Sequence, residues 1–137
     1  MLVYTFRTNP FKDKLKEIFP DIFIFDKLNE DFKIFSNKIL KEKLDKILGI
    51  AKSDISQSET KTINQFNNKK MDKNGRENYN LTPWSNFDIS KKPTTSFCNW
   101  TMYKIAEFIE DNNLNTKLSF VHLNKKDLDK RINFALV

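Results

Sequence analysis

The sequence predicts an α/β domain, a three-layer α/β/α sandwich around a short mixed, mostly parallel sheet. In the first 51 residues, strand-like and helix-like patterns alternate, and such alternation is typical of parallel strands joined by crossover helices. The run from Ile22 to Phe25 is apolar throughout, which favours an interior strand covered by helices on both faces. A length of 137 residues with 39% hydrophobic residues suits a single domain over residues 1–137.

The first 51 residues supply three strands and two helices. The apolar run from Leu2 to Phe6 predicts a first strand, and apolar residues then recur at helical spacing from Phe11 until Pro20 ends that helix. After the strand at 22–25, a second helical face extends over residues 30–45. Residues 46–51 form the third predicted strand.

The rest of the chain begins with a long polar segment, residues 52–80. Connections of this length are usually functional or partly disordered, so we expect a mobile segment with little regular structure and a turn at Asn74-Gly75. The remaining elements are predicted in this order: a short strand at 86–90, a largely buried helix from 98 to about 111, a strand at 118–122 and an amphipathic helix at 124–136.

The formal charge of +6 comes almost entirely from lysine, with three arginines in the chain. The lysines are interleaved with acids, which indicates a solvated surface, and a lysine-rich nucleic-acid contact protein is the weaker alternative. We find no signal peptide and no apolar run long enough to span a membrane, so we expect a cytoplasmic protein. One cysteine excludes an internal disulfide, which fits a reducing compartment.

Cys98 and His122 are the candidate reactive pair. Cys98 opens a predicted helix and His122 ends the next predicted strand, and sites in open α/β sheets form beyond the carboxyl ends of strands. A helix amino terminus and a nearby imidazolium lower the pKa of a thiol, which favours a nucleophile with its base. A small buried hydrophobic cysteine and a histidine satisfied at a strand end are the competing interpretation.

A third group should orient the imidazole by accepting its other N–H. The residues alone leave several carboxylates open for this role: Asp54, Glu59, Asp72, Glu77 and Asp88.

Two segments, SFCNWTMY at 96–103 and FVHL at 120–123, carry a resemblance to a known family, the pyroglutamyl peptidase I (pyrrolidone carboxyl peptidase) family of cysteine peptidases. The segment from Ser96 to Tyr103, SFCNWTMY, is similar to the nucleophile motif of that family, in which Cys-Asn is followed by a tyrosine on the same helix. The segment from Phe120 to Leu123, FVHL, is similar to the strand that ends in the catalytic histidine, at a matching interval.

Further upstream, LGIA at 48–51 and ISQSETKTIN at 55–64 resemble the glycine-rich turn of the family and its Glu-Arg-x-Ala-x-Asn segment. The first strand, with Asn9-Pro10 after it, is similar to the first strand and substrate-binding loop. The resemblance therefore touches nearly the whole chain in the same order, and it implies a shortened, divergent member with a phosphorylase/hydrolase-like fold.

The resemblance implies an omega peptidase that removes an amino-terminal pyroglutamyl residue through a thioacyl-enzyme, with no metal or cofactor. Cys98 would be the nucleophile, His122 the general base and then acid, and Glu59 the residue that orients the imidazole. Substrate would be bound by Phe6, Phe11 and Asn64, and the oxyanion would be held at Cys98 and Asn99. The partner would be a peptide or small amide, and homo-oligomerisation stays open.

The sequence also departs from the family pattern. Lys52, Ser53 and Asp54 stand where the family turn has two more glycines and an arginine, and Thr60 replaces the arginine after the glutamate. The stretch between Asn64 and Cys98 is also shorter. These departures motivate the second interpretation, a catalytically inactive relative that acts as a binding or scaffold protein.

Overall fold

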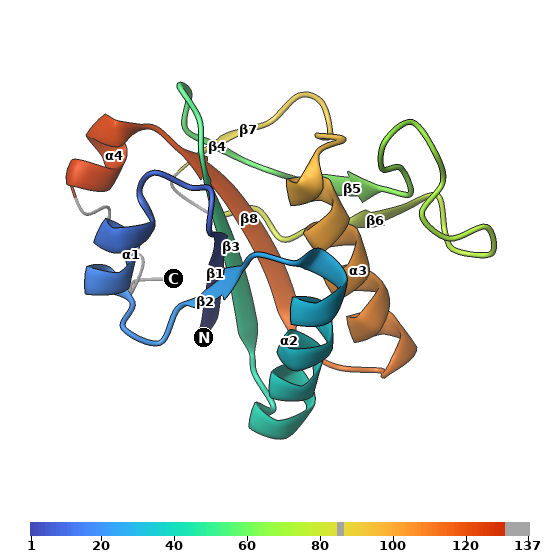
Figure 1. Cartoon of the computed structure of the whole chain (residues 1–137). Helices are drawn as coiled ribbons and strands as arrows, with labels where there is room; N and C mark the ends of the chain where they lie inside the picture. The colour runs from blue at the N-terminus through green and yellow to red at the C-terminus, as the bar shows by residue number, and fades with distance from the viewer. Residues whose placement is uncertain (85–86, 131–137) are drawn as a thin grey trace.

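The central sheet of the molecule has six strands in the order β2-β1-β3-β8-β4-β7 (Figure 1). This computed structural model describes residues 1–84 and 87–130. Four neighbouring strands are parallel: β2 (Phe23–Phe25), β1 (Leu2–Phe6), β3 (Lys46–Lys52) and β8 (Lys117–Leu123). β4 (Gln57–Ser58) pairs antiparallel with β8, and β7 (Asp88–Ile89) pairs parallel with β4. The predicted mixed, mostly parallel sheet is confirmed.

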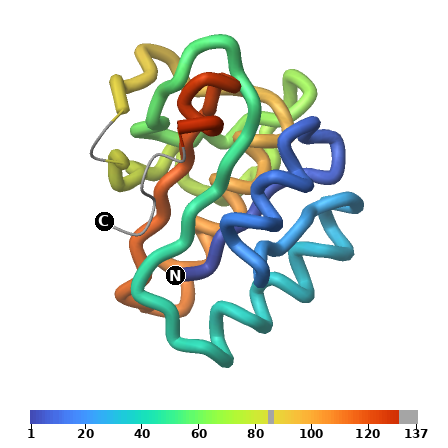
Figure 2. Tube along the Cα trace, turned by 90° about the vertical axis from the view of Figure 1, so that its left-hand side faces the viewer, coloured from blue at the N-terminus to red at the C-terminus, as the bar shows by residue number. Residues whose placement is uncertain are grey.

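Helices cover both faces of this sheet. α1 (Lys12–Ile18) and α4 (Lys125–Asp129) lie on one face, which is turned toward the viewer in Figure 2. α2 (Leu28–Glu42) and α3 (Phe97–Asp111) lie on the other, where α3 is buried over most of its first three turns. Two apolar clusters fill the spaces between the layers, one beneath α2 and α3 and one beneath α1. The three-layer α/β/α sandwich is therefore confirmed.

Local sequence signals fix the helix ends. Ser96 caps α3, since its hydroxyl accepts a hydrogen bond from the Cys98 backbone N–H (3.2 Å), and α1 ends just before Pro20. Asn124 caps α4 in the same way, accepting from the backbone N–H of Asp127 (2.8 Å). Of the helix expected at 124–136, the structure has α4 over Lys125–Asp129, and residues 131–137 lie outside the described part. No helix in the described ranges is long and apolar enough to cross a membrane.

The strand β2 is at the edge of the sheet, so its expected interior position is wrong. Its side chains are nonetheless half-buried or buried. Phe23 and Phe25 contact the Phe35 ring of α2, with ring centroids 5.1 and 5.2 Å away, and Ile22 packs against the cluster beneath α1. An edge strand covered by helices and loops therefore has the same all-apolar pattern as an interior one.

The polar segment 52–80 has more regular structure than expected. It contributes β4 to the main sheet and holds a separate antiparallel pair, β5 (Lys61–Ile63) and β6 (Asn78–Asn80). The expected turn is present next to Asn74, closed by a hydrogen bond from Gly75 N–H to Asp72 O (3.2 Å). Of the strand expected at 86–90, the structure has β7, and residue 86 lies outside the described part.

Gly49 lies in the middle of β3 rather than in a turn. It pairs with Tyr4 of β1 on one side and with Phe120 of β8 on the other. A Cβ at this position would overlap both aromatic rings, whose centroids are 6.0 Å apart. The glycine therefore makes room for two large side chains above the centre of the sheet.

Replacing Gly49 by alanine is expected to lower the free energy of unfolding by about 1–3 kcal/mol, because the added methyl group must displace buried rings. Urea denaturation measures the change, and an unchanged midpoint would contradict the packing described. Gly75→Ala is not a neutral control, since a Cβ there would overlap the hydroxyl of the buried Tyr103, which donates to Arg76 O (2.7 Å).

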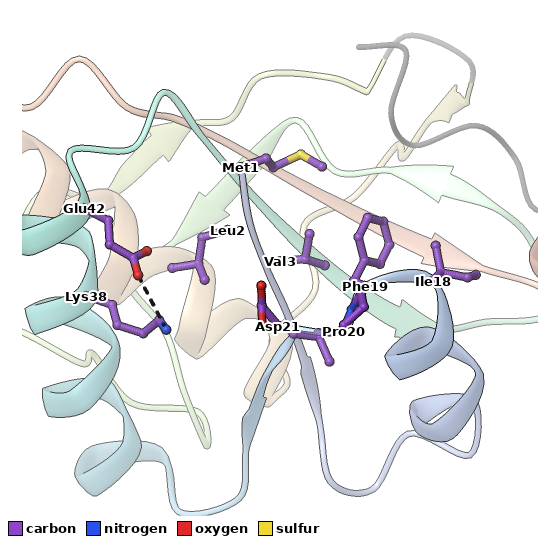
Figure 3. A pocket seen from close by; sticks show the side chains of 10 residues that line it. Met1, Leu2, Val3, Ile18, Phe19, Pro20, Asp21, Lys38 and Glu42 are labelled. Carbon is purple, nitrogen blue, oxygen red and sulfur yellow. Dashed lines mark ion pairs between the residues drawn. The ribbon is translucent and has the colours of Figure 1, made fainter.

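A hollow of about 610 Å³ opens at the amino-terminal end of β1 (Figure 3). Ile18, Phe19 and Pro20 line one side of it, and the other carries the Lys38–Glu42 ion pair of α2 (3.7 Å). Cysteine and histidine are absent from its described lining. The candidate reactive groups lie instead at the carboxyl ends of the strands.

Candidate active site

The carboxyl ends of three parallel strands bring the reactive residues together. Phe6 ends β1, Ala51 is close to the end of β3, and Ala51 is in register with His122 of β8. The amino terminus of α3 reaches the same edge and places Cys98 there. Cys98 and His122 line one cavity, as expected of residues that follow the carboxyl ends of strands in an open α/β sheet.

Glu59 approaches His122 from the antiparallel side of the sheet. In the β4–β8 pairing Gln57 lies opposite His122, and the Glu59 backbone N–H donates to Phe120 O (2.9 Å), so Glu59 lies diagonally across from His122 on the same face. Glu59 Oε1 is 3.0 Å from His122 Nε2, and the glutamate is 3% exposed. With Nε2–H donating to the carboxylate, Nδ1 is the basic nitrogen of the neutral ring.

The other carboxylates that the sequence left open lie elsewhere. Glu77 is exposed and forms an ion pair with Lys70 (2.7 Å), and Asp72 belongs to the turn at Gly75. Asp88 is in the exposed strand β7, and Asp54 lies in the loop after β3. Glu59 is thus the candidate that the fold brings into contact with His122.

The cavity has a volume of about 290 Å³ and an aromatic wall. Phe6 and Phe97 form that wall, with an edge-to-face contact at a centroid distance of 4.7 Å. The other residues that line it, besides Cys98 and His122, are Thr8, Asn9, Pro10, Ala51, Lys52 and Ser96. Phe97 was not predicted as a site residue, although its place directly before Cys98 was a usable signal.

Two of the expected substrate-binding residues lie outside this cavity. Phe11 lines a different hollow, which shares Pro10 and Lys52 with this cavity, and it packs on the cluster beneath α1. Asn64 is buried in the loop after β5, where its Oδ1 accepts from the backbone N–H groups of Met71 (2.9 Å) and Asp72 (3.0 Å). Its Nδ2 donates to Asp72 O (2.6 Å), so the amide closes the 64–72 loop.

Asn99 fastens the start of α3 to the strand β5. Its Oδ1 accepts from Thr62 Oγ1 (2.6 Å) and from Ile63 N–H (3.0 Å), while Nδ2 donates to Ile63 O (2.8 Å) and Gln65 O (2.9 Å). The Asn99 side chain is fully engaged, so any oxyanion contact from this residue would have to come from its backbone. The cysteine is thereby held rigidly at the helix start.

Burial raises the pKa of the Cys98 thiol to about 12. Hydrogen bonds from the Ser96 hydroxyl and the Cys98 backbone N–H act in the opposite direction, and the Glu59 carboxylate adds to the increase. The expectation of a lowered thiol pKa at the helix start is therefore not met. At neutral pH the resting group is a thiol, which needs a base before it can attack.

This protonation state predicts slow alkylation of Cys98 by iodoacetamide. At about pH 8.5 a free cysteine is half ionised, whereas a thiol with a pKa of about 12 has a thiolate fraction roughly 10³-fold smaller. A more basic thiolate is a stronger nucleophile, which offsets part of the smaller thiolate fraction. The alkylation rate of Cys98 should still be at least about tenfold below that of free cysteine. The rate should keep rising up to about pH 12.

The urea-unfolded protein is the control, because its cysteine should titrate with an ordinary pKa. A rate plateau already reached at neutral pH in the folded protein would instead mean a preformed thiolate–imidazolium pair.

Within the described residues, no three His, Cys, Asp or Glu side chains gather as metal ligands. The groups available at this edge are a thiol, an imidazole hydrogen-bonded to a buried carboxylate, and backbone N–H groups at a helix start. Together they can perform nucleophilic attack on a carbonyl with proton transfer through the imidazole.

Neither a protein-family model nor a curated protein sequence matches this chain. Solved structures do match it. The pyrrolidone carboxyl peptidase from Thermococcus litoralis is 15% identical with a TM-score of 0.71, and the match covers 90% of this chain and 75% of that one. Pyroglutamyl peptidase I from Bacillus amyloliquefaciens is 14% identical, with a TM-score of 0.71 over 90% of this chain and 80% of that one.

A variant of the pyrrolidone carboxyl peptidase from Pyrococcus furiosus is 13% identical, with a TM-score of 0.71 over 99% of this chain and 86% of that one. The chain therefore has the fold of these peptidases, as the sequence resemblance implied. At such low identity the similarity shows the fold, and the activity has to be argued from the site.

Proposed function

We propose that the chain is a cysteine-type omega peptidase that removes an amino-terminal pyroglutamyl residue. The observation that carries this proposal is the 3.0 Å hydrogen bond between Glu59 and His122 beside a cavity that Cys98 also lines. His122 belongs to β8, Glu59 directly follows β4, and Cys98 lies at the start of α3, so the three come from separate stretches of chain. A structural role for the cysteine alone would not require a buried carboxylate behind the histidine.

The proposed reaction has two steps. His122 Nδ1 takes the Cys98 proton as Sγ attacks the pyroglutamyl carbonyl carbon, and the same proton then passes to the leaving amine as the C–N bond breaks. Water, deprotonated by His122, attacks the thioester, releases pyroglutamate and returns the proton to sulfur. The Glu59 carboxylate stabilises the imidazolium that forms in both steps.

The oxyanion would be held by backbone N–H groups at the start of α3, a contribution of about 3 kcal/mol in comparable sites. The Cys98 N–H points at Ser96 Oγ in the resting protein (3.2 Å), so the oxyanion would share or replace that contact. Attack moves negative charge from the sulfur to this oxygen. The oxygen would lie at the amino-terminal end of α3, where the helix dipole stabilises an anion.

The cavity supports a small, neutral acyl group. Phe6 and Phe97 offer aromatic surface to a flat five-membered lactam ring. Asn9 holds the loop that forms another part of the lining, since its Nδ2 donates to Thr5 Oγ1 (2.9 Å) and its Oδ1 accepts from Phe11 N–H (2.9 Å). The volume of about 290 Å³ leaves room for one ring with the start of its leaving group.

A fluorogenic pyroglutamyl amide tests this proposal. We expect hydrolysis by the wild-type protein, and much slower hydrolysis of the matched prolyl amide, which has the same ring without the lactam carbonyl and carries a charged amine. Absence of hydrolysis of the pyroglutamyl amide by folded protein across pH 6–9 would contradict the enzymatic function.

An inactive binding protein is the second candidate, favoured by the protonated thiol and by the engagement of the Cys98 N–H with Ser96. It predicts that a pyroglutamyl amide binds and protects Cys98 from alkylation but is recovered intact. Product analysis of the same incubation separates the two functions.

A further inference from the structure

A second hollow adjoins the cavity at the carboxyl edge of the sheet. It has a volume of about 500 Å³, and Lys52 and Pro10 line both it and the Cys98 cavity. We call it the lysine hollow, defined by its lining residues Pro10, Phe11, Lys52, Ser53, Asp54, Asn124, Lys125 and Lys126. A ligand that extends from Cys98 past Lys52 would enter it.

Backbone contacts hold the walls of the lysine hollow together. Lys52 ends β3 in register with Leu123 of β8, and the next residue, Ser53, donates its N–H to Leu123 O (2.8 Å). The Asn124 N–H in turn donates to Ser56 Oγ (3.0 Å), which ties the loop after β3 to the start of α4. The fold therefore brings lysines from two distant parts of the sequence to the same hollow.

The lining residues include three exposed lysines and one acid, Asp54. Across the described residues, no ion pair includes Lys52, Lys125 or Lys126. Asp129 of α4 forms an ion pair with Lys14 (2.8 Å), and the nearby charge of Lys125 helps to lower the pKa of that carboxyl. An excess of cations over carboxylates in a concave surface raises the local concentration of anionic ligands.

The chemistry of the proposed reaction fixes which part of a substrate could reach this hollow. A pyroglutamyl residue is blocked at its amide nitrogen by its own ring, so nothing precedes it in the chain. With the ring in the Cys98 cavity, every remaining substrate atom belongs to the leaving group. A charged group in the lysine hollow would therefore lie on the first or second residue after the scissile amide.

We propose that the lysine hollow binds an acidic side chain of the leaving peptide and that Lys52 sets a preference for acidic pyroglutamyl peptides. This inference rests on the proposed function and names the substrate class for it. Lys52 lines both the Cys98 cavity and the lysine hollow, so it is the lysine that a ligand extending from one to the other would pass.

Two peptides of equal shape test the preference, one with aspartate and one with asparagine in the first position after pyroglutamate. At low salt we expect kcat/KM to be about tenfold higher for the acidic peptide, and the ratio should fall as ionic strength rises. Lys52→Met should bring the ratio close to one. Lys33→Met, which removes an exposed lysine from α2 in the other helical layer, should leave the ratio unchanged.

Hydrolysis of both peptides at equal kcat/KM would overturn the inference and leave the proposed function intact. If neither peptide is hydrolysed, the proposed function is overturned. A binding measurement then tests separately whether the lysine hollow prefers the acidic peptide. Calorimetry with Cys98→Ser protein should give tighter binding of the acidic peptide than of the neutral one. Equal affinities, or no binding of either peptide, would overturn the inference.

Discussion

Replacing Cys98 by serine is expected to reduce kcat for a pyroglutamyl amide by roughly 10⁴-fold or more. The serine hydroxyl has nearly the shape of the thiol but is a much weaker acid and nucleophile, and the site is arranged around sulfur at the start of α3. KM should change little, because the aromatic wall and the loop at Asn9 stay in place. Steady-state kinetics at saturating substrate measures the loss.

Thermal unfolding of the Cys98→Ser protein is the necessary control. Cys98 is 5% exposed, so the hydroxyl is placed in a mostly apolar setting beside Ser96, and a modest fall in melting temperature is acceptable. Retention of more than about one-tenth of wild-type kcat in a folded Cys98→Ser protein would rule out Cys98 as the nucleophile.

Glu59→Gln is expected to lower kcat by about 10⁴-fold with KM nearly unchanged. The amide has the shape of the carboxylate and can still bond to His122 Nε2, but it lacks the charge that stabilises the imidazolium formed during attack. Removing a carboxylate that is 3% exposed should cost little stability, since the desolvation of that charge is relieved. A merely structural role would alter stability rather than kcat.

Glu77→Gln is a matched control for this substitution. Glu77 is one of the other carboxylates open from the sequence, and it forms an exposed ion pair with Lys70 (2.7 Å). Its removal should leave kcat within about twofold, because Glu77 does not line the Cys98 cavity. Loss of the exposed ion pair should lower the free energy of unfolding by less than about 1 kcal/mol. Equal losses in the two variants would contradict the assignment of Glu59 as the orienting residue.

The periodicity of apolar residues was sufficient to predict the main elements of the fold. Strands β1, β3 and β8 and helices α1, α2 and α3 occur where the pattern predicted them, within a few residues. The alternation of strands and helices was sufficient to predict the order of the layers, because crossover connections between parallel strands allow few topologies. The edge position of β2 could not be predicted, since cover from helices and loops gives it the composition of an interior strand.

The segment 52–80 was the hardest to predict because its order comes from single side chains. The amides of Asn64 and Asn99 each satisfy three or more polar partners and hold short strands that have no periodic pattern of their own. An asparagine in a polar stretch has the same sequence context whether it closes a loop or contacts a substrate.

The reactive pair was accessible from sequence, whereas its surroundings were accessible only in part, as with Phe6 of the aromatic wall. Cys98 and His122 follow from their places at a helix start and a strand end, and Glu59 from the resemblance. The wall residue Phe97 had a usable signal in its place directly before Cys98, whereas the position of Phe11 depends on the path of the loop after Phe6. The protonation state of the thiol depends on burial by residues from several elements, which periodicity does not give.

Trapping of the acyl-enzyme tests the central claim most directly. Wild-type protein is mixed with an activated pyroglutamyl ester, quenched in acid within seconds and examined by intact and peptide mass spectrometry. We expect a mass increase of one pyroglutamyl group, located on the peptide that contains Cys98, and no such increase in Cys98→Ser protein. Turnover of the ester without any adduct on Cys98, or an equal adduct in the serine variant, would contradict the thioacyl mechanism.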